Sequence, residues 1–586
     1  MKHRSTVLVL LAILSGGAAP ALAAQPPVEP PRRPELTPCK EPGVPPDALC
    51  GTYEVFENRV ARSGRKIPLK VLVLPAKEAQ RRLPDPFIYF AGGPGDASIP
   101  EGLFTAQQLA PLRQKRDVLL VDSRGTGGSD GLFCTELQGR QGVQGFLDDF
   151  LPTDRIHACR DRLKKDHDLS WYTSDAAMDD IEEVRTALGY GKVNLMGGSY
   201  GTRAALTYLR RHPQSVRTIT LLGVVAPDER YPLGLARFSQ QVLDGVIAEC
   251  EGDAACRGAF PQLRQEIDAV LRRVTAEPAR VELIDVETGQ PFELRLGRTG
   301  VAQTLRYMTY QPGGAAFLPL LVHRAAAGDF LPLAQAARLY GSFMTSTSDG
   351  FYQSVTCAED VPFIREEDIA KAVAGTYIGD FRIRKQQAAC EGWPVRDLGK
   401  EIQAPVVSDV PALLISGERD PATPAANGTQ VARTLKNSLH LIIADGAHST
   451  NGMKGTECLD GVMTAFIEAG RVQGLDTSCV ANIRRPDFVL SFGDPEVQVS
   501  RADLEKLAGT YTKAETGAVA QVDVVANRLR ITFDGEPALL VSTAPTRFRV
   551  EGFAPDRTVT FQESGGRITS VTLSASGAPD LVLQRK

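Results

Sequence analysis

The sequence predicts an α/β protein with a mostly parallel sheet, a large helical insertion and a C-terminal antiparallel β domain. Three observations predict this arrangement. Short apolar strands alternate with glycine-rich turns and helix-like segments up to residue 227, and again from about residue 405. Residues 228–404 are mainly helical in pattern. Beyond residue 496, apolar and polar residues alternate with a period of two.

The first residues are typical of a secretory signal peptide. Lys2 and Arg4 precede a short apolar run, Val7–Leu14, and Ala21-Leu22-Ala23 forms a small-residue cleavage site. The alternative is a membrane anchor, but the run is shorter than a bilayer span requires, and no cysteine follows the site for lipid attachment. We therefore expect an exported protein, periplasmic or extracellular, with no membrane contact after cleavage.

Composition limits the partners. The 586 residues are 43% hydrophobic and 23% charged, as in ordinary globular proteins. The net charge of −4 becomes −6 when Lys2 and Arg4 are removed, because each carries one positive charge. This balance does not favour nucleic-acid binding, which requires a basic surface.

The ten cysteines indicate disulfides. An even number in an exported chain favours pairing, although about 945 connectivities are possible. Zinc is the alternative, but the sequence has no Cys-x-x-Cys and six histidines after cleavage, so we expect no metal. The cysteines fall in close successive pairs, which favours nearest-neighbour bonds: Cys39–Cys50, Cys134–Cys159, Cys250–Cys256, Cys357–Cys390 and Cys458–Cys479.

The elements follow in order along the chain. The residues Thr173-Ser174-Asp175 are suited to begin a helix that ends at Gly189, and a second helix is expected over Thr202–Arg211. The expected strands are Ile67–Ala76, Phe87–Ala91, Val118–Val121, Val193–Met196, Val216–Val225, Ala412–Ile415 and Leu439–Ile443. The expected domains are a signal peptide (1–23), a proline-rich leader (24–48), an α/β core in two parts (49–227 and 405–485), a cap insertion (228–404) and a β domain (496–586).

The segment Gly197–Gly201 matches the Gly-x-Ser-x-Gly pattern of a nucleophile elbow. A strand precedes Ser199 and a helix follows it, which is the context the motif requires. Side chains at Gly197 or Gly201 would collide with neighbouring backbone in such a turn. An ordinary strand–turn–helix junction is the alternative.

A serine nucleophile needs a base and an orienting acid, which follow in the order Ser, Asp, His in this kind of sheet. Asp420 and His448 each come just after an expected strand, where active sites of open α/β sheets lie. Asp409 and Asp445 are the rival acids. The other histidines lie in expected helices, in the insertion or within a strand: His157, His167, His212, His323 and His440.

The glycine-rich turn Phe90–Ser98 is a candidate oxyanion hole. Pro94 has no N–H, so Gly93 and Gly92 are the candidate donors, together with the N–H of Tyr200 after the nucleophile. A glycine-rich hairpin is the alternative.

Together these motifs resemble the α/β-hydrolase family of prolyl and tripeptidyl aminopeptidases, with the tripeptidyl branch more similar. The residues that carry the resemblance, over about residues 36–482, are "GGPG", "DSRGTGGSD", "GGSYGTR", "GERDPATP", "GAH", "CGTYEVFENR" and "AHSTNGMKGTEC". The resemblance implies an α/β-hydrolase fold with a helical cap and a metal-free serine exopeptidase that acts on free peptide N-termini. The β domain, with its "LAGTY" start, resembles the small β-barrel-like domain of some β-lactamase-related hydrolases.

The resemblance also implies where a substrate ammonium binds. In the family an acidic residue follows a cysteine in the cap, which corresponds first to Glu359 and then to Asp360. A solvated helix start is the alternative for this pair. Arg203 is expected to be structural. The chain has Ala91 where the family often has histidine before Gly-Gly-Pro-Gly, which bears on the hydrogen bonding of that loop and on substrate preference.

The sequence thus predicts a cofactor-free serine aminopeptidase that acts on peptides with free N-termini and releases single residues or short peptides, with a possible relation to proline. An esterase with the same three residues is the alternative, and a catalytically silent binding protein is a third reading. Sequence patterns leave the oligomeric state open.

Overall fold

The computed structural model describes residues 34–137, 143–342, 347–515, 517–533, 535–552, 557–575 and 579–586. The expected signal peptide and the first residues of the leader lie outside this part of the chain.

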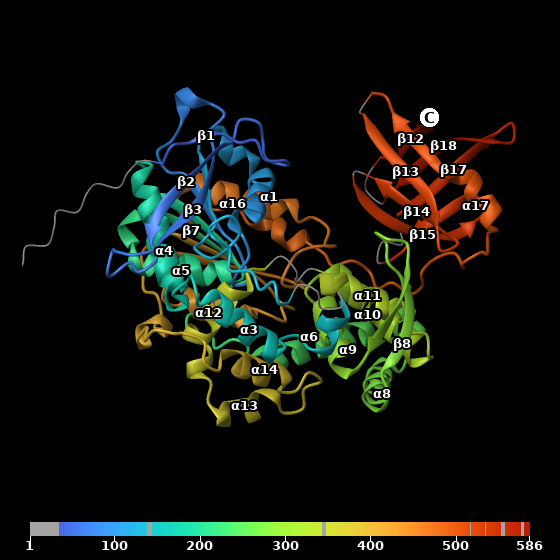
Figure 1. Ribbon diagram of the computed structural model, residues 1–586, viewed down its shortest axis with the longest axis horizontal. Helices are drawn as coiled ribbons and strands as arrows, with labels where there is room; N and C mark the ends of the chain where they lie inside the picture. Colours follow the sequence, from blue (N-terminus) through green and yellow to red (C-terminus); the bar gives the residue numbers. More distant parts are fainter. Residues whose placement is uncertain are drawn as a thin grey trace, which may run out of the picture.

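A twisted sheet forms the centre of the α/β core (Figure 1). Its order is β1-β2-β3-β5-β4-β6-β7-β10-β11, antiparallel from β1 to β5 and parallel from β5 to β11. The strands are β1 (Thr37–Pro38), β2 (Leu49–Phe56), β3 (Lys66–Leu74), β4 (Phe87–Phe90), β5 (Val118–Val121), β6 (Val193–Gly198), β7 (Val216–Leu222), β10 (Ala412–Gly417) and β11 (Ser438–Ile443). The predicted mostly parallel sheet is confirmed.

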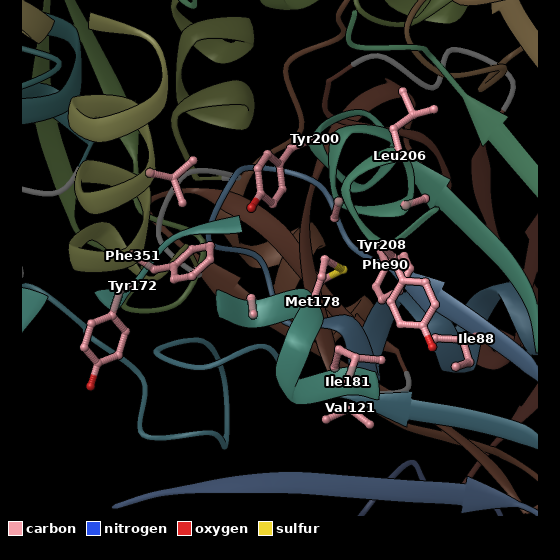
Figure 2. Close-up of a cluster of buried hydrophobic side chains, with 14 of the residues drawn as sticks. Ile88, Phe90, Val121, Tyr172, Met178, Ile181, Tyr200, Leu206, Tyr208 and Phe351 are labelled. Carbon is pink, nitrogen blue, oxygen red and sulfur yellow. The ribbon is translucent and has the colours of Figure 1, made fainter. Parts of the chain in front are cut away.

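Helices cover both faces of this sheet, because its central strands are apolar on both sides. In β4, Ile88 and Phe90 pack with α4 (Ser174–Ala187) and α5 (Tyr200–Arg211), as Figure 2 shows. Phe87 and Tyr89 point to the opposite face, where they join the core beneath α1 (Ser98–Gln108) and α16 (Glu457–Ala469). Because successive side chains of a strand point to opposite faces, β4 contributes residues to the hydrophobic cores on both faces of the sheet.

The insertion is a helical cap with a hydrophobic core of its own. Its last part is shared with the α/β core, because Phe351 and Val355 of α12 pack in the core beneath α4 and α5. The elements of the insertion are α6 (Leu235–Gly252), α7 (Ala254–Ala259), α8 (Leu263–Ala276), β8 (Ala279–Ile284), β9 (Pro291–Leu296), α9 (Arg298–Met308), α10 (Pro312–Ala326), α11 (Leu331–Ser342), α12 (Asp349–Glu359), α13 (Glu366–Val373) and α14 (Phe381–Cys390).

The C-terminal β domain is a closed antiparallel barrel beside the cap, drawn in orange to red in Figure 1. Arg530 of the barrel donates to the carbonyls of Val286 and Glu287 in the β8–β9 hairpin, at 3.0 and 2.6 Å. The barrel consists of β12 (Gly509–Lys513), β13 (Ala518–Val525), β14 (Arg528–Phe533), β15 (Glu536–Ala544), β16 (Arg547–Val550), β17 (Thr558–Ser564), β18 (Arg567–Ser574) and β19 (Leu581–Arg585), preceded by α17 (Arg501–Leu507).

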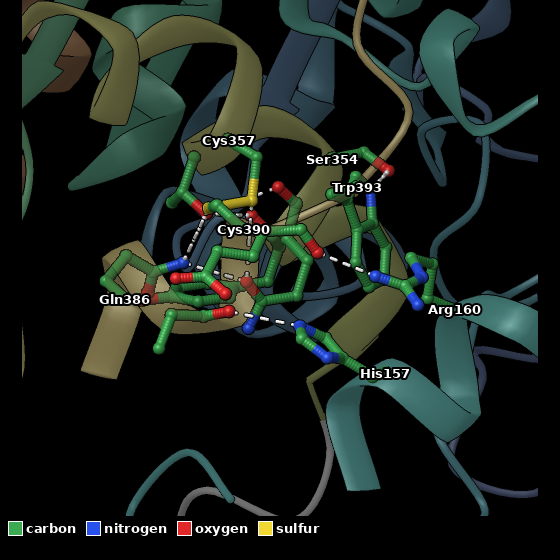
Figure 3. The surroundings of a disulfide bond; sticks show 12 residues. His157, Arg160, Ser354, Cys357, Gln386, Cys390 and Trp393 are labelled. Atoms are coloured by element: carbon green, nitrogen blue, oxygen red, sulfur yellow. Dashed lines mark hydrogen bonds between the residues drawn. A yellow bond between two sulfur atoms is a disulfide. The ribbon is translucent and has the colours of Figure 1, made fainter. Parts of the chain in front are cut away.

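All five expected cysteine pairs are disulfide-bonded. Cys357–Cys390 joins α12 to α14 within the cap (Figure 3). Beside it, His157 contacts the carbonyl of Ala388 and Arg160 donates to that of Glu391, which ties α14 to α3 (Thr153–Leu163) of the core. The C-terminal ends of α12 and α14 are thus joined covalently, and hydrogen bonds hold α14 against α3.

Candidate active site

The turn between β6 and α5 holds Ser199 in a strained conformation. Its φ is 53° and its ψ is −123°, in a region that residues with a Cβ rarely occupy. A Cβ at Gly197 would lie 2.1 Å from the carbonyl oxygen of Gly201, and one at Gly201 would lie 2.0 Å from that of Phe90. Only glycine fits these two positions, as the sequence motif predicts. The turn presents the partly exposed Ser199 at the carboxyl edge of the sheet.

Asp420 and His448 lie together at the same edge, in the loops after β10 and β11. The Oδ2 of Asp420 is 2.8 Å from the Nδ1 of His448, and its Oδ1 accepts from the N–H groups of Ala422 and Thr423 at 2.7 and 2.8 Å. Burial raises the pKa of Asp420, but His448 and these donors outweigh it, so the net pKa is below the ordinary value. Asp420 is therefore held as a buried carboxylate beside the imidazole.

The side chain of Thr423 contacts both residues of this pair. Its hydroxyl lies 2.7 Å from the Oδ2 of Asp420 and 3.1 Å from the Nδ1 of His448. The ring of Tyr310 packs edge-on against the imidazole with centroids 5.1 Å apart.

Ser199 and His448 approach each other at the loop after β7. The N–H of Ser199 donates to the carbonyl of Leu222 at 2.9 Å, and a Cβ on the next residue, Gly223, would lie 3.4 Å from the Cε1 of His448. Both side chains line one cavity.

The glycine turn after β4 lies beside the serine. A Cβ on Gly92 would be 3.5 Å from the Cβ of Ser199. The N–H of Gly92 donates to the carboxylate of Glu101, whose pKa burial and Asp96 raise to about 7. Within the described part of the chain, no acceptor meets the N–H of Gly93 or Tyr200. Of the two expected loop donors, Gly93 is therefore the one left to bind a ligand.

The cavity at Ser199 has a volume of about 820 Å³, within the range of small-molecule and cofactor sites. It is bounded by α1 and α16 of the core and by α9 and α12 of the cap, with Phe104, Met463, Arg306 and Tyr352 among its wall residues. The cap thus covers part of the open sheet edge and forms a cavity there with the core helices.

Comparisons with known proteins agree with this geometry. Residues 85–257 match the family model described as "alpha/beta hydrolase fold", and residues 375–479 match that described as "TAP-like protein". The chain thus has the α/β-hydrolase fold and is similar to TAP-like proteins over residues 375–479. Serine protease Hip1 of Mycobacterium tuberculosis is 26% identical over 497 residues, which cover 76% of this chain and 90% of Hip1.

Two further relatives are peptidases by name. Tripeptidyl aminopeptidase of Streptomyces lividans is 22% identical over 480 residues, which cover 74% of this chain and 84% of the relative. Proline iminopeptidase of Neisseria gonorrhoeae is 27% identical over 141 residues, which cover 24% of this chain and 32% of the relative. This TAP-like hydrolase is a serine peptidase.

The two acidic residues expected to bind a substrate ammonium occupy different places in this TAP-like hydrolase. Asp360 lines the cavity, pairs with Arg203 at 2.9 Å and accepts from the N–H of Tyr231 at 3.2 Å. Glu359 does not line it; its carboxylate accepts from the N–H and hydroxyl of Ser174 at 2.7 and 2.8 Å. Of the two expected residues, Asp360 therefore lies at the cavity and Glu359 lies outside its lining.

Glu229, which the sequence patterns did not single out, also lines the cavity. Its carboxylate accepts from the side-chain amide of Asn427, and its own backbone carbonyl accepts from Arg203 at 2.8 Å. Burial raises the pKa of Glu229 to about 7. Its position a few residues past the end of β7, at the carboxyl edge of the sheet, was the available signal.

The other candidate residues have structural partners in the TAP-like hydrolase. Asp409 pairs with Lys436 at the surface, and the N–H of Asp445 donates to Glu418. The remaining histidines contact Ala388 (His157), Asp130 (His167), Asp179 (His212), Glu266 (His323) and Ser416 (His440).

One cluster in the described residues has the spacing of a metal site: Cys134, Glu136 and Cys159. Its two sulfurs are joined in a disulfide, so they offer no thiolate ligands. No helix in the described part of the chain has both the length and the apolar content needed to cross a bilayer.

Proposed function

We propose that this serine peptidase is an exported aminopeptidase that removes short peptides from free peptide N-termini. His448 takes the proton of Ser199 as the hydroxyl attacks the scissile carbonyl, and Asp420 fixes the imidazole tautomer. The N–H groups of Gly93 and Tyr200 stabilise the oxyanion. His448 then protonates the leaving amine, and water hydrolyses the acyl-enzyme.

The observation that carries the aminopeptidase proposal is the charge on the cap side of the cavity. Asp360 and Glu229 lie with Arg203 at this end. Two carboxylates and one guanidinium leave one net negative charge when both acids are ionised. A single substrate ammonium neutralises it, whereas a blocked N-terminus would leave a desolvated carboxylate without a partner.

The size of the cavity supports a short peptide rather than one residue as the released part. At about 820 Å³ it lies toward the upper end of the range of about 300–1,000 Å³ for small-molecule sites. The names of the Streptomyces and Neisseria relatives support aminopeptidase action. Export is supported by the signal-like N-terminus and by five disulfides, which persist in oxidising compartments.

The test compares arylamides of peptides of one to four residues with free and acetylated N-termini. We expect free peptides to be cleaved with a kcat/KM at least about a hundredfold higher, because a buried ion pair is lost on acetylation. Equal rates on both series would exclude the aminopeptidase and favour the esterase.

Ser199→Ala is the matched control for the chemistry. It should fold, bind peptide and hydrolyse none of these substrates. Full turnover by this variant would remove Ser199 from the mechanism.

A further inference from the structure

Two buried arginines in the cap have no carboxylate partner among the residues that the structure describes. Among the described residues, five arginine side chains are buried. Three are paired with an aspartate, at 2.9, 2.7 and 2.9 Å: Arg116 with Asp85, Arg124 with Asp180, and Arg203 with Asp360. The other two, Arg306 of α9 and Arg382 of α14, form no ion pair in the described part of the chain, although each is only 2% exposed.

Arg306 lies on the wall of the Ser199 cavity. Its guanidinium carbon is 5.1 Å from the ring centroid of Tyr307 and 4.7 Å from that of Tyr310, and it donates to the hydroxyl of Tyr310. Its buried Nε has no hydrogen-bond partner in the described ranges of the chain.

Arg382 lies behind the same wall. Its guanidinium carbon is 3.7 Å from the ring centroid of Phe150, and it donates to the hydroxyls of Tyr231 and Tyr352 at 3.1 and 3.3 Å. All three of these aromatic residues line the cavity. The buried Nη1 of Arg382 likewise has no hydrogen-bond partner among the described residues.

Within the described part of the chain, no carboxylate forms an ion pair with either guanidinium of this pair. The undescribed internal segments of the α/β core and cap, 138–142 and 343–346, contain no Asp or Glu. A buried guanidinium without an anion is unfavourable, and aromatic faces offset only part of that loss. The pair also acts on its surroundings: burial raises the pKa of Tyr231, but Arg382 and Arg306 outweigh it and lower the net pKa.

We propose that Arg306 and Arg382 form an anion subsite that binds an acidic side chain, Asp or Glu, on the amino side of the scissile bond. The proposed position of the subsite relative to the scissile bond follows from two contacts. Tyr231 joins the subsite to Asp360, because its hydroxyl binds Arg382 while its N–H donates to Asp360. Tyr310 joins it to His448. The subsite lies between the proposed ammonium site and the catalytic histidine, and this assignment rests on the proposed function.

The kinetic test uses tripeptide arylamides with Glu or its isostere Gln at each position in turn. At one position we expect the wild-type protein to prefer Glu by about tenfold or more in kcat/KM, as for a buried charge-assisted hydrogen bond. In Arg306→Gln and Arg382→Gln this Glu/Gln ratio should fall to about one. Arg272→Gln, an exposed arginine on α8, should keep the wild-type ratio.

The binding test needs neither hydrolysis nor folded arginine variants. Calorimetry on Ser199→Ala compares three tripeptides: a Glu-containing amide, its Gln-containing twin, and that twin with a free C-terminal carboxylate. Tighter binding of the Glu amide alone supports a side-chain subsite. Tighter binding of the free acid alone would assign the arginines to the α-carboxylate and overturn the side-chain proposal.

The two proposals fail in different ways. Preference for free over acetylated peptides, with a Glu/Gln ratio of one at every position and equal binding of both amides, would overturn the anion subsite and leave the aminopeptidase intact. Equal cleavage of free and acetylated peptides would exclude the aminopeptidase, while the calorimetry would still decide whether the arginines bind a carboxylate.

Discussion

At the residue scale, Thr423 contacts both members of the Asp420–His448 pair with one hydroxyl. A hydroxyl in this position restrains the imidazole ring and, together with Asp420, fixes its orientation. Loss of this hydroxyl should therefore lower kcat more than it changes KM.

Thr423→Val removes this hydroxyl at nearly constant volume. We expect kcat to fall by about tenfold, with KM changed little, because a hydrogen bond to a charged pair is lost. Steady-state kinetics on a free-N-terminal arylamide measure the split. Thr429→Val, on the exposed side of α15 (Ala425–Ala432), is the matched control and should be silent. A rise in KM at unchanged kcat would contradict a positioning role.

Glu229 predicts a pH effect on binding. Its pKa of about 7 means that it gains a proton as the pH falls through neutrality, so the cap end of the cavity loses negative charge. We expect KM for free-N-terminal peptides to rise by about tenfold below that pKa. Acetylated peptides should not show this rise.

Glu229→Gln should have a high KM at every pH and no such dependence, whereas Glu251→Gln, exposed on α6, should behave as the wild type. A wild-type KM that is flat across this pH range would exclude ammonium binding by Glu229.

At the scale of elements, the Cys357–Cys390 disulfide fixes α12 against α14 (Figure 3). α12 ends at Glu359, directly before Asp360, and α14 carries Arg382. The positions of Asp360 and Arg382, two proposed substrate-binding groups of the cap, thus depend on helices that one disulfide joins.

Replacing both cysteines, Cys357→Ser with Cys390→Ser, should lower the free energy of unfolding by about 3 to 4 kcal/mol, as expected for a closed loop of this length. KM should rise as well. Denaturant unfolding measures the first effect and kinetics the second. The Cys250–Cys256 disulfide closes a shorter loop, away from the cavity. Replacing it by Cys250→Ser with Cys256→Ser should therefore cost less stability and leave KM unchanged. Equal effects of the two double variants would contradict this reasoning.

At the scale of the whole molecule, the barrel is separate from the site. The cavity is lined by residues no later than Met463, and the barrel has its own hydrophobic core. Its contacts with the cap include the hydrogen bonds of Arg530 to the β8–β9 hairpin and of Gln335 to Glu551.

A chain that ends at residue 495 should therefore keep kcat/KM within about threefold of the full-length protein, because domains with separate cores fold as units. Arylamide kinetics together with thermal unfolding test this expectation. Loss of activity in a truncated protein that still unfolds cooperatively would show that the barrel acts on the site.

The sequence by itself determined the fold class, the places of the seven predicted core strands to within three residues, and the residues whose chemistry depends on local backbone. Gly197 and Gly201 could be predicted because the elbow forbids a Cβ, and Asp420 and His448 because parallel strands end at one edge of the sheet. The disulfide pairs followed from short separations along the chain.

Only the tertiary structure decided which acidic groups line the cavity at Ser199. The N–H of Ser174, the first residue of α4, is bonded by Glu359 from 185 residues away, and Glu359 lies outside the lining of the cavity. The proposed roles of Glu229, Asp360, Arg306 and Arg382 rest on burial and on neighbours distant in sequence. Charge pairing in a folded interior depends on three-dimensional position, which periodicity and motif spacing along one chain do not encode.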